Sequence, residues 1–365
     1  MRLLDKYLLR EYLVTVAYCV VGFSMFQVMC DLFYRFSSIM EAGLSPLTIA
    51  RYYVCWLMPY MEYVFPASLL LATLYTLWQF ARRGELTAMR AAGISLYRLT
   101  VPFLAVGLCF SVFTAVMMET VAPPASQWMA DFTDNDFRPV QHKIYANQAH
   151  YNAADHRLWL VERFDLKNPD RLTGVKVSEE RADGSLKTEW FAARAEWLDG
   201  QWWFYNVRVQ RYNAAGGPIG SLTPVPGSAH GVQMPFATER PSHFANEVKK
   251  WEFLSVRNML EYLRSHPHLS RDAFASRKAD LQLRLAVPWA CFVVTLFGIP
   301  AGVRSGRESV TVGILLTVFC FFIFHVLTQV GIFLAKRQIL WPWAGAWLPN
   351  IVFLAAGLRM LYKIR

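Results

Sequence analysis

The chain has 365 residues, of which 55% are hydrophobic and 18% are charged, and its formal net charge is +10. Soluble domains carry about 25% charged residues, so this composition excludes a set of ordinary soluble domains and indicates that a bilayer covers part of the apolar surface. In a soluble protein such a charge would suggest nucleic-acid binding, whereas in a membrane protein it can mark one side of the membrane.

Six apolar stretches are long enough to cross a hydrocarbon core of roughly 30 Å as helices. The first stretch is too long for a signal peptide, and no small-residue cleavage site follows it. We therefore predict six transmembrane spans, at residues 13–33, 52–80, 99–121, 281–303, 310–335 and 341–362.

Lysine and arginine are distributed unevenly between the two ends of these spans. Twelve of them lie before span one, between spans two and three, between spans four and five, and after span six. The opposite short loops hold four: Arg35, Arg51, Lys336 and Arg337. The positive-inside rule then places both termini in the cytoplasm.

Residues 122–280 differ in kind from the rest of the chain. They hold 20 Lys/Arg and 19 Asp/Glu, a net charge of +1, so +9 of the total belongs to the membrane half. This distribution removes the main reason to expect a nucleic-acid partner. By the parity of the spans the segment lies outside, in the periplasm of a cell with two membranes.

The pattern of this external segment is typical of β structure. Short runs rich in Val, Trp, Phe and Tyr predict strands at residues 143–151, 157–164, 172–178, 188–198 and 201–212. Asp183-Gly184 and Asp199-Gly200 are hairpin signals. From Trp251 the apolar spacing becomes helical and ends before Pro267, and a second helix is expected from Arg271.

The predicted fold class is therefore an α-helical membrane protein with six transmembrane helices and an all-β, jelly-roll-like domain, one sheet stacked on another, inserted between helices 3 and 4. The expected divisions are residues 1–121 for the first transmembrane half, 122–250 for the β domain, 251–280 for a helical connector and 281–365 for the second transmembrane half.

Motifs for catalysis or metal binding are missing from the sequence. All six cysteines lie in the predicted spans, so the external domain has no disulfide framework or thiolate metal site. His266 and His268 flank a proline in what we interpret as a solvated turn. The sequence has no P-loop, G-x-S-x-G or kinase motif, so we expect no catalytic residue, metal or cofactor in this chain.

The segment 81–99, ARRGELTAMRAAGISLYRL, carries the most specific short pattern. Gly84 breaks the helix of span two, and Glu85 then stands in the first turn of a new helix, where the helix dipole favours an acid. Ala88, Met89, Ala91 and Ala92 leave a narrow face that fits a partner's groove. The alternative is an ordinary interfacial loop whose arginines only mark the cytoplasmic side.

This segment resembles the cytoplasmic loop of the LptF/LptG permeases (the YjgP/YjgQ family), which export lipopolysaccharide from the inner membrane. Other stretches resemble the same family in the same order: residues 4–8 (LDKYL) its interfacial first helix, 172–203 its β-jelly roll, 277–302 its fourth span, and 347–350 (WLPN) its sixth span. The similarity runs essentially from end to end.

The resemblance implies that this chain is a permease subunit of an ABC transporter. A coupling helix at about residues 82–93 would insert into an LptB-like ATPase dimer, which binds the ATP and Mg²⁺. The residues that match the family's coupling motif are Arg83, Glu85, Ala88, Met89, Arg90 and Gly93. Glu85 would pair with an arginine of the ATPase.

The family acts as a heterodimer of LptF-like and LptG-like chains whose first and fifth spans line a cavity for the lipid. Asp31 and Arg35, four residues apart, contact lipid or simply pair with each other. An aspartate near this position departs from the family pattern and leaves Arg35 as the expected phosphate contact. His325 and Gln329 line the dimer seam or bond between helices. The cavity candidates are Gln27, Asp31, Arg35, Glu62, Glu119, Arg284, His325 and Gln329.

The resemblance also implies that the β domain passes lipopolysaccharide to partner jelly rolls, including an LptC-like periplasmic protein, through exposed sheet edges. Clustered aromatic residues line an acyl-chain groove between the sheets or form an ordinary core. They are Trp190, Phe191, Trp197, Trp202, Trp203 and Phe204.

The sequence therefore predicts an inner-membrane subunit that extracts lipopolysaccharide from the outer leaflet, with an LptG-like rather than LptF-like character. An alternative function is a membrane-embedded lipid-modifying enzyme, such as a transferase, that uses Asp31, Glu62 and Glu119 as acids or bases. A scaffold anchored by its spans would need far fewer than six.

Overall fold

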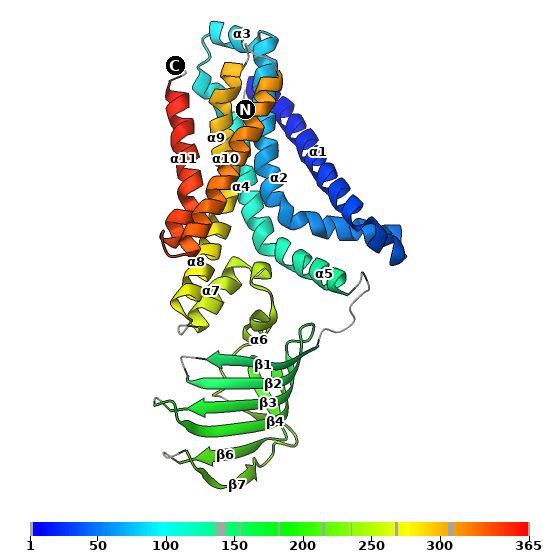
Figure 1. Ribbon diagram of the computed structural model, residues 1–365, viewed down its shortest axis with the longest axis vertical. Helices are drawn as coiled ribbons and strands as arrows, with labels where there is room; N and C mark the ends of the chain where they lie inside the picture. Colours follow the sequence, from blue (N-terminus) through cyan, green and yellow to red (C-terminus); the bar gives the residue numbers. More distant parts are fainter. Residues whose placement is uncertain are drawn as a thin grey trace. The chain divides into compact units, whose positions relative to one another are not determined.

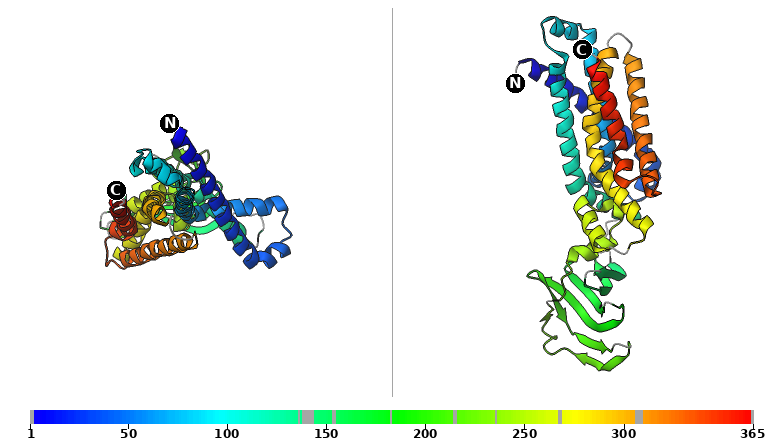
Figure 2. Two further views of the ribbon diagram at one scale, coloured as in Figure 1. Left: turned by 90° about the horizontal axis from the view of Figure 1, so that it is seen from above. Right: turned by 90° about the vertical axis from the view of Figure 1, so that its left-hand side faces the viewer.

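A computed structural model of the chain describes residues 3–135, 137, 144–152, 155–181, 183–213, 216–234, 236–266, 269–305 and 310–363 (Figures 1 and 2). It divides into two compact units: unit 1 comprises residues 1–138 and 271–365, and unit 2 is the inserted segment 139–270. The expected divisions after residues 121 and 280 differ from these limits, because helices α5 (Ala122–Asp134) and α8 (Arg271–Ala286) are grouped with unit 1.

Unit 1 is helical, and six of its described segments are long and apolar enough to cross a membrane, as predicted. Residues 4–8, expected as an interfacial helix, form the first turns of the first span. Helix α3 (Glu85–Ala91) joins the second and third spans. The spans are α1 (Leu3–Glu41), α2 (Pro46–Arg82), α4 (Leu96–Thr120), α8 with η2 (Val287–Trp289) and α9 (Ala290–Ser305), α10 (Val310–Lys336) and α11 (Pro342–Tyr362).

Local sequence explains where these helices begin and bend. Ser45 and Ser95 are N-caps whose hydroxyl oxygens accept the backbone N–H groups of Thr48 (3.3 Å) and Arg98 (3.4 Å). Figure 1 shows that α2 bends within its length. Pro59 and Pro66 lie inside this helix, and each lacks the N–H that a straight helix uses for its hydrogen bonds.

The core of unit 1 forms where α2 packs against α1, α4 and α9. Small residues allow some of its helices to approach closely. A side chain at Gly331 of α10 would meet the backbone of Gly345 in α11, and a side chain at Gly357 of α11 would lie 3.2 Å from the backbone of Phe297 in α9. Close packing at small residues is a principal source of helix association in lipid, so these contacts define the bundle.

Unit 2 is built on an eight-stranded antiparallel sheet, which confirms a β domain in the middle of the chain. The order is β1-β2-β3-β4-β5-β8, with β6 paired to β4 and β7 paired to β6. The strands are β1 (Ile144–Asn152), β2 (Arg157–Asp165), β3 (Arg171–Glu180), β4 (Leu186–Leu198), β5 (Gln201–Tyr205), β6 (Arg208–Tyr212), β7 (Pro218–Pro224) and β8 (Val232–Gln233).

Several strand predictions are confirmed and two are corrected. Asp199 (φ 52°) and Gly200 (φ 78°) form the tight turn between β4 and β5. The predicted strand 201–212 is two strands, because Asn206 (φ 53°) interrupts it while both parts keep the same register on β4. The described strands belong to one sheet rather than to two stacked sheets. Lys143, predicted to begin the first strand, lies outside the described residues.

One row of facing residues, which crosses the sheet from strand to strand, has irregular pairing. We call this row the irregular line. Asn147 (φ 53°) in β1 and Gly174 (φ 63°) in β3 are left-handed, as is Asn206 between β5 and β6. In a regular strand, residues that face the core are two positions apart. Across the irregular line they are three positions apart, so each strand has an apolar side chain in the core both before and after the line. These pairs are Val161 and Phe164, Leu172 and Val175, Ala192 and Ala195, and Phe204 and Val207.

Helices close one side of this sheet. α6 (Pro241–Val248) places Phe244 against Trp159 and Trp202 of the core, at ring-centroid distances of 5.2 and 5.9 Å. The expected helix from Trp251 is a short 3-10 turn, η1 (Trp251–Phe253), followed by α7 (Val256–Ser265), which ends before Pro267 as predicted. The core of unit 2 therefore lies between the sheet and α6.

Candidate functional site

Helix α3 is a short exposed helix held between two left-handed glycines. Gly84 (φ 74°) ends α2 and Gly93 (φ 81°) ends α3, so the chain reverses direction at both ends of seven residues. Leu86 is buried in the bundle core and Met89 packs against it. The predicted coupling residues Ala88 and Arg90 are exposed, and so is Thr87. The helix thus has an anchored face and an open face.

The predicted coupling residue Glu85 belongs to the anchored side. Its carboxylate accepts a hydrogen bond from the Tyr7 hydroxyl of α1 (3.1 Å) and lies 3.8 Å from the Arg83 guanidinium. Tyr7 in turn packs on Phe80 of α2, with ring centroids 5.8 Å apart. Tyr7 and Leu86 were not predicted as site residues. Tyr7 stands in the family-like segment LDKYL, which was the available signal.

A hollow of about 360 Å³ adjoins the exposed face of α3. Arg90 and Gly93 line it together with Ile94, Leu96 and Tyr97 after the helix, and with Leu361 of α11. Figure 1 shows α3 and the two termini at the same end of unit 1. This end also carries the basic flanks of the spans, so α3 lies where the positive-inside rule places the cytoplasm.

Among the polar span residues, Asp31 and Arg35 form an ion pair. The Arg35 Nε donates to the Asp31 Oδ1 at 3.0 Å, as their i,i+4 spacing allows. The neighbouring helix α2 presents two buried tyrosines, Tyr52 and Tyr53, in an aromatic cluster with α5. Gln27, one turn earlier, is half-buried. This part of α1 therefore combines the ion pair with apolar residues, Val28 and Leu32, that pack against the same cluster.

Two other predicted residues line one small cavity. Glu62 and His325 enclose, with Asn350 and apolar neighbours, a space of about 40 Å³ between α2, α8, α10 and α11. The His325 ring meets the edge of Tyr63 at 5.5 Å. Gln329 lies one turn along α10 and is exposed, so the structure gives these two α10 residues different surroundings.

The three carboxylates that the alternative enzyme function would use are found in two separate groups. Asp31 pairs with Arg35, whereas Glu62 and Glu119 both act electrostatically on Arg284 of α8. Each group therefore contains a guanidinium of opposite charge to its acids, one for the single acid Asp31 and one shared by Glu62 and Glu119. Such pairing is an expected way to hold charges among transmembrane helices.

Apolar side chains of α1 and α10 remain exposed in this single chain. On α1 the exposed fraction is 76% for Tyr18 and 77% for Phe33, and on α10 it is 63% for Phe322. By contrast, 72% of the apolar window of the α8–α9 span is buried. The predicted cavity-lining spans, one and five, thus have faces that the rest of the chain does not cover.

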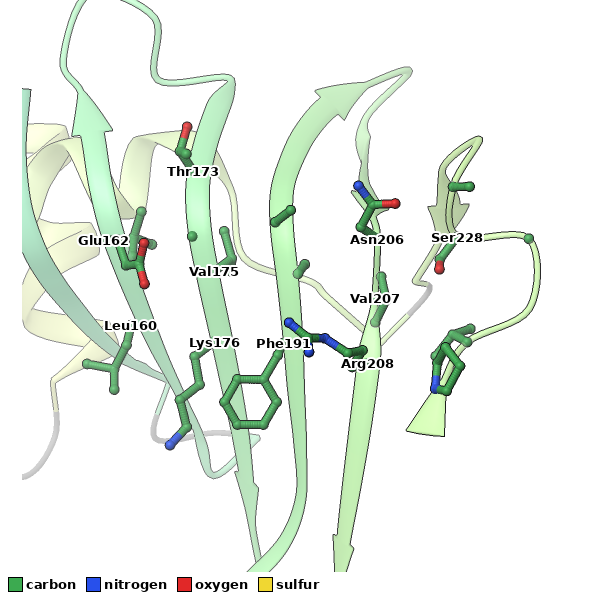
Figure 3. A pocket seen from close by; sticks show the side chains of 18 of the residues that line it. Leu160, Glu162, Thr173, Val175, Lys176, Phe191, Asn206, Val207, Arg208 and Ser228 are labelled. Atoms are coloured by element: carbon green, nitrogen blue, oxygen red, sulfur yellow. The ribbon is translucent and has the colours of Figure 1, made fainter. Parts of the chain in front are cut away.

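A groove of about 1250 Å³ runs along the irregular line of the sheet in unit 2. Figure 3 shows Leu160, Lys176, Phe191 and Arg208 side by side on neighbouring strands, as their register requires. Asn206 and Val207 line the same groove. Its wall is largely apolar and carries two basic side chains.

The aromatic residues predicted to line a groove lie mostly elsewhere. Trp202 and Phe204 are 0% exposed and belong to the core, and Trp190, Trp197 and Trp203 do not line the groove. The Trp202 indole donates to the backbone carbonyl of Glu239 at 2.6 Å. Of the predicted cluster, Phe191 contacts the groove. The alternative of an ordinary core describes Trp202 and Phe204.

Lys176 belongs to a buried charge network beside the groove. Its ammonium donates to the Glu189 carboxylate at 2.8 Å, and the Tyr212 hydroxyl donates to the same carboxylate at 2.7 Å. Burial acts to raise the pKa of Glu189, but the hydrogen bonds from Lys176 and Tyr212 outweigh it and hold that pKa below its usual value. Glu189 is therefore ionised at neutral pH.

Unit 2 also contains one group of metal-ligating side chains that sequence reasoning missed. His150 of β1, Glu247 of α6 and His266, which follows α7, place their ligand atoms within 4.8 Å of one another. We expected His266 to stand in a solvated turn with His268; it is half-buried, and His268 lies outside the described residues. The 97 positions between His150 and Glu247 explain why no spacing motif indicated the group.

Comparison with known proteins gives a match over nearly the whole chain. The family model for the lipopolysaccharide export system permease LptF/LptG matches residues 6–363. The match includes all six spans, α3 and the inserted sheet. No curated protein matches the chain closely enough to be reported.

Proposed function

The chain belongs to the LptF/LptG family of lipopolysaccharide export system permeases, and we propose that it is the membrane subunit of an ABC exporter powered by a separate ATPase. The observation that carries this proposal is the family match across residues 6–363 together with an exposed α3. Because the sequence has no P-loop, ATP and Mg²⁺ would be bound by an LptB-like ATPase dimer.

Helix α3 is the proposed docking element for this ATPase. Its exposed face carries Ala88 and Arg90, and the adjoining hollow of about 360 Å³ offers space for a partner side chain. Leu86 and Met89 fix the opposite face in the bundle. A push on the exposed face would therefore move the ends of α2 and α4, to which α3 is joined by short turns.

Glu85 would carry part of this motion to α1. Its hydrogen bond to Tyr7 joins the coupling helix to the first turns of the first span. One carboxylate oxygen accepts from Tyr7, and the other lies toward Arg83, 3.8 Å away. A carboxylate can accept several hydrogen bonds, so a partner arginine can be added to the existing contacts.

The lipid would leave the membrane between α1 and α10 of this chain and the corresponding spans of an LptF-like or LptG-like partner chain. The exposed apolar faces of both helices support this, since a second chain or the lipid must cover them. Arg35 is the proposed contact for an anionic headgroup. Its pairing with Asp31 would hold it in place until a phosphate competes for it.

Unit 2 would lie in the periplasm and pass the lipid to an LptC-like protein. Both termini would then be cytoplasmic, as the charge distribution favours. The groove suits an amphiphile, because its wall is largely apolar while Arg208 can pair with an anionic group; Lys176 beside it is already paired with Glu189, and the wall also carries Glu162. β1 forms one edge of the sheet, and an edge strand can pair with a strand of another domain.

The test is reconstitution of the full-length chain with its paralogous permease and the ATPase in proteoliposomes containing lipopolysaccharide. We expect co-purification of the three chains, ATP hydrolysis that lipopolysaccharide stimulates, and export to a soluble acceptor. The proposal is wrong if the chain binds no ATPase subunit or if lipopolysaccharide is not moved.

Two variants make this test specific. Glu85→Ala should fold and assemble yet lose most of the stimulated hydrolysis and export. Glu41→Ala, which removes an exposed carboxylate at the far end of α1, is the matched control and should retain both. Full export by Glu85→Ala would contradict the coupling role of the carboxylate.

A further inference from the structure

Three side chains from separate elements of unit 2 converge on one point. The Glu247 Oε1 lies 3.0 Å from the His150 Nδ1 and 2.8 Å from the His266 Nε2. β1, α6 and the end of α7 each supply one of the three. Two imidazole nitrogens and one carboxylate oxygen are the ligand set of a three-ligand zinc site with an open fourth position.

The hydrogen bonds of His266 indicate what its ring presents to this point. Its Nδ1 lies 3.0 Å from the backbone carbonyl oxygen of Tyr262, to which only a protonated Nδ1 can donate. In a neutral ring the Nε2 then carries no proton, and its lone pair points at the anionic carboxylate oxygen of Glu247. In this tautomer the contact needs a positive species between the two atoms, either a second proton on the ring or a metal ion. The Ser265 hydroxyl also lies 3.0 Å from the Nδ1, and in the other tautomer it donates to the Nδ1 while the Nε2–H donates to Glu247.

The rings are held in position before any ion arrives. The His266 ring stacks on Tyr262, with centroids 4.2 Å apart and planes 20° apart. The His150 side chain is 2% exposed and meets Phe244 edge-on at 5.4 Å. Ligands fixed by packing and by hydrogen bonds to a carbonyl are the supporting arrangement found around metal sites.

A third imidazole nearby is engaged elsewhere. The ring of His243 lies 5.5 Å from that of His150, but its Nε2 lies 2.9 Å from Glu261 and its Nδ1 faces the backbone N–H of Arg240 at 3.4 Å. Among the residues that the structure describes, three therefore serve as ligands, and water would supply the fourth. The side chains of Glu247 and His266 are 16% and 19% exposed, which leaves a route from solvent.

We propose that His150, Glu247 and His266 bind a divalent transition-metal ion, with Zn²⁺ the best match to their nitrogen and oxygen donors. Bond lengths of about 2.0–2.2 Å in a tetrahedron separate the ligand atoms by about 3.3 Å. The distances of 2.8 and 3.0 Å from the Glu247 oxygen thus need to open by a few tenths of an ångström, while the two imidazole nitrogens, which lie within 4.8 Å of each other, need to reach the same separation. The ion fastens the edge strand β1 to α6 and α7.

The experiment uses the purified full-length chain in detergent, stripped with a chelator and dialysed against ZnCl₂. We expect one Zn²⁺ per chain, bound at least 10-fold more weakly after His266→Gln or Glu247→Gln. His230→Gln changes an exposed histidine of the same unit and should leave binding intact. All six cysteines remain in every variant, so any binding by thiols is common to all.

A second measurement separates the loss of a metal ligand from poor folding of a variant. Zn²⁺ should raise the thermal unfolding temperature of the unchanged chain and of His230→Gln, but not that of His266→Gln. Equal binding by all four proteins, or no binding by the unchanged chain, would overturn the proposal. Neither measurement depends on transport, so this outcome is separate from that of the proposed function.

Discussion

Large aromatic side chains have opposite surroundings in the two units. In unit 2, Trp159 and Trp202 are 0% exposed, whereas Phe33 on α1 of unit 1 is 77% exposed. The residues are similar in apolar area, and the difference lies in what covers them. In unit 2 the chain itself removes them from water, while α1 leaves them for the bilayer or for a partner chain.

A second contrast lies along α1 itself. Only 6% of its most apolar window is buried, yet Tyr12 near its beginning is fully buried and donates to or accepts from the Thr73 hydroxyl at 2.9 Å. Near its other end Ile39 is buried in the aromatic cluster of α2 and α5. The helix is thus anchored at both ends and open between them, which is the form expected of one wall of a shared cavity.

The largest expected effect tests the contrast between the two aromatic environments. Trp202→Ala should destabilise unit 2 by about 3–5 kcal/mol, because it removes a fully buried side chain and leaves a cavity. Phe33→Ala should leave the unfolding temperature of the purified chain nearly unchanged. Thermal unfolding followed by circular dichroism measures both, and a comparable loss in the two variants would break the comparison.

Glycines provide a matched test within unit 1. Gly357→Leu places a side chain against the backbone of Phe297, so we expect a loss of about 1–3 kcal/mol. Gly22 of α1 has nothing within 4 Å of the position of an added Cβ, so Gly22→Leu should unfold at nearly the same temperature as the unchanged chain. If Gly22→Leu were the more harmful, the middle of α1 would have to be packed in the free protein.

Most of the fold could be predicted because its signals are local or periodic. Long apolar runs predicted the six spans, and Asp199-Gly200 predicted the β4–β5 turn. The break between β5 and β6 could not be predicted. Asn206 is left-handed there because of the irregular line that crosses several strands, and no single strand's sequence shows that line.

The candidate site was predictable only where one helix carries it. The spacing of Asp31 and Arg35 gave their ion pair as one of two alternatives, and the exposed Ala88 and Arg90 agree with a docking face. The aromatic groove was placed on the wrong side chains, because alternation along a strand identifies a face without saying whether that face is core. The hydrogen bond between Tyr7 and Glu85 joins residues 78 positions apart, and although the family-like segment LDKYL marks Tyr7, no sequence pattern links it to Glu85.

A smaller effect concerns the buried charges of unit 2. The pKa of Glu189 is lowered in the folded chain, so its stabilising contribution is complete above the usual value of 4.5 and is lost as the pH falls through the lower folded value. Glu189→Gln should therefore show a shallower loss of stability below pH 4.5. Asp199→Asn, at an exposed turn, is the control. The prediction is wrong if both variants lose stability with falling pH as steeply as the unchanged chain.

The smallest expected effect tests the anchored beginning of α1. Tyr7→Phe keeps the ring contact with Phe80 and removes one hydrogen bond to Glu85, a change of about 0.5–1.5 kcal/mol. If α1 takes up motion from α3 through this bond, stimulation of the ATPase by lipopolysaccharide should fall roughly 2- to 10-fold while the unfolding temperature shifts little. Tyr75→Phe, on α2 with 42% of Tyr75 exposed, should leave stimulation unchanged. Equal stimulation in the two variants would mean that α1 is held at its beginning by Leu8 and Tyr12 alone, and that Glu85 acts on the partner without involving the first span.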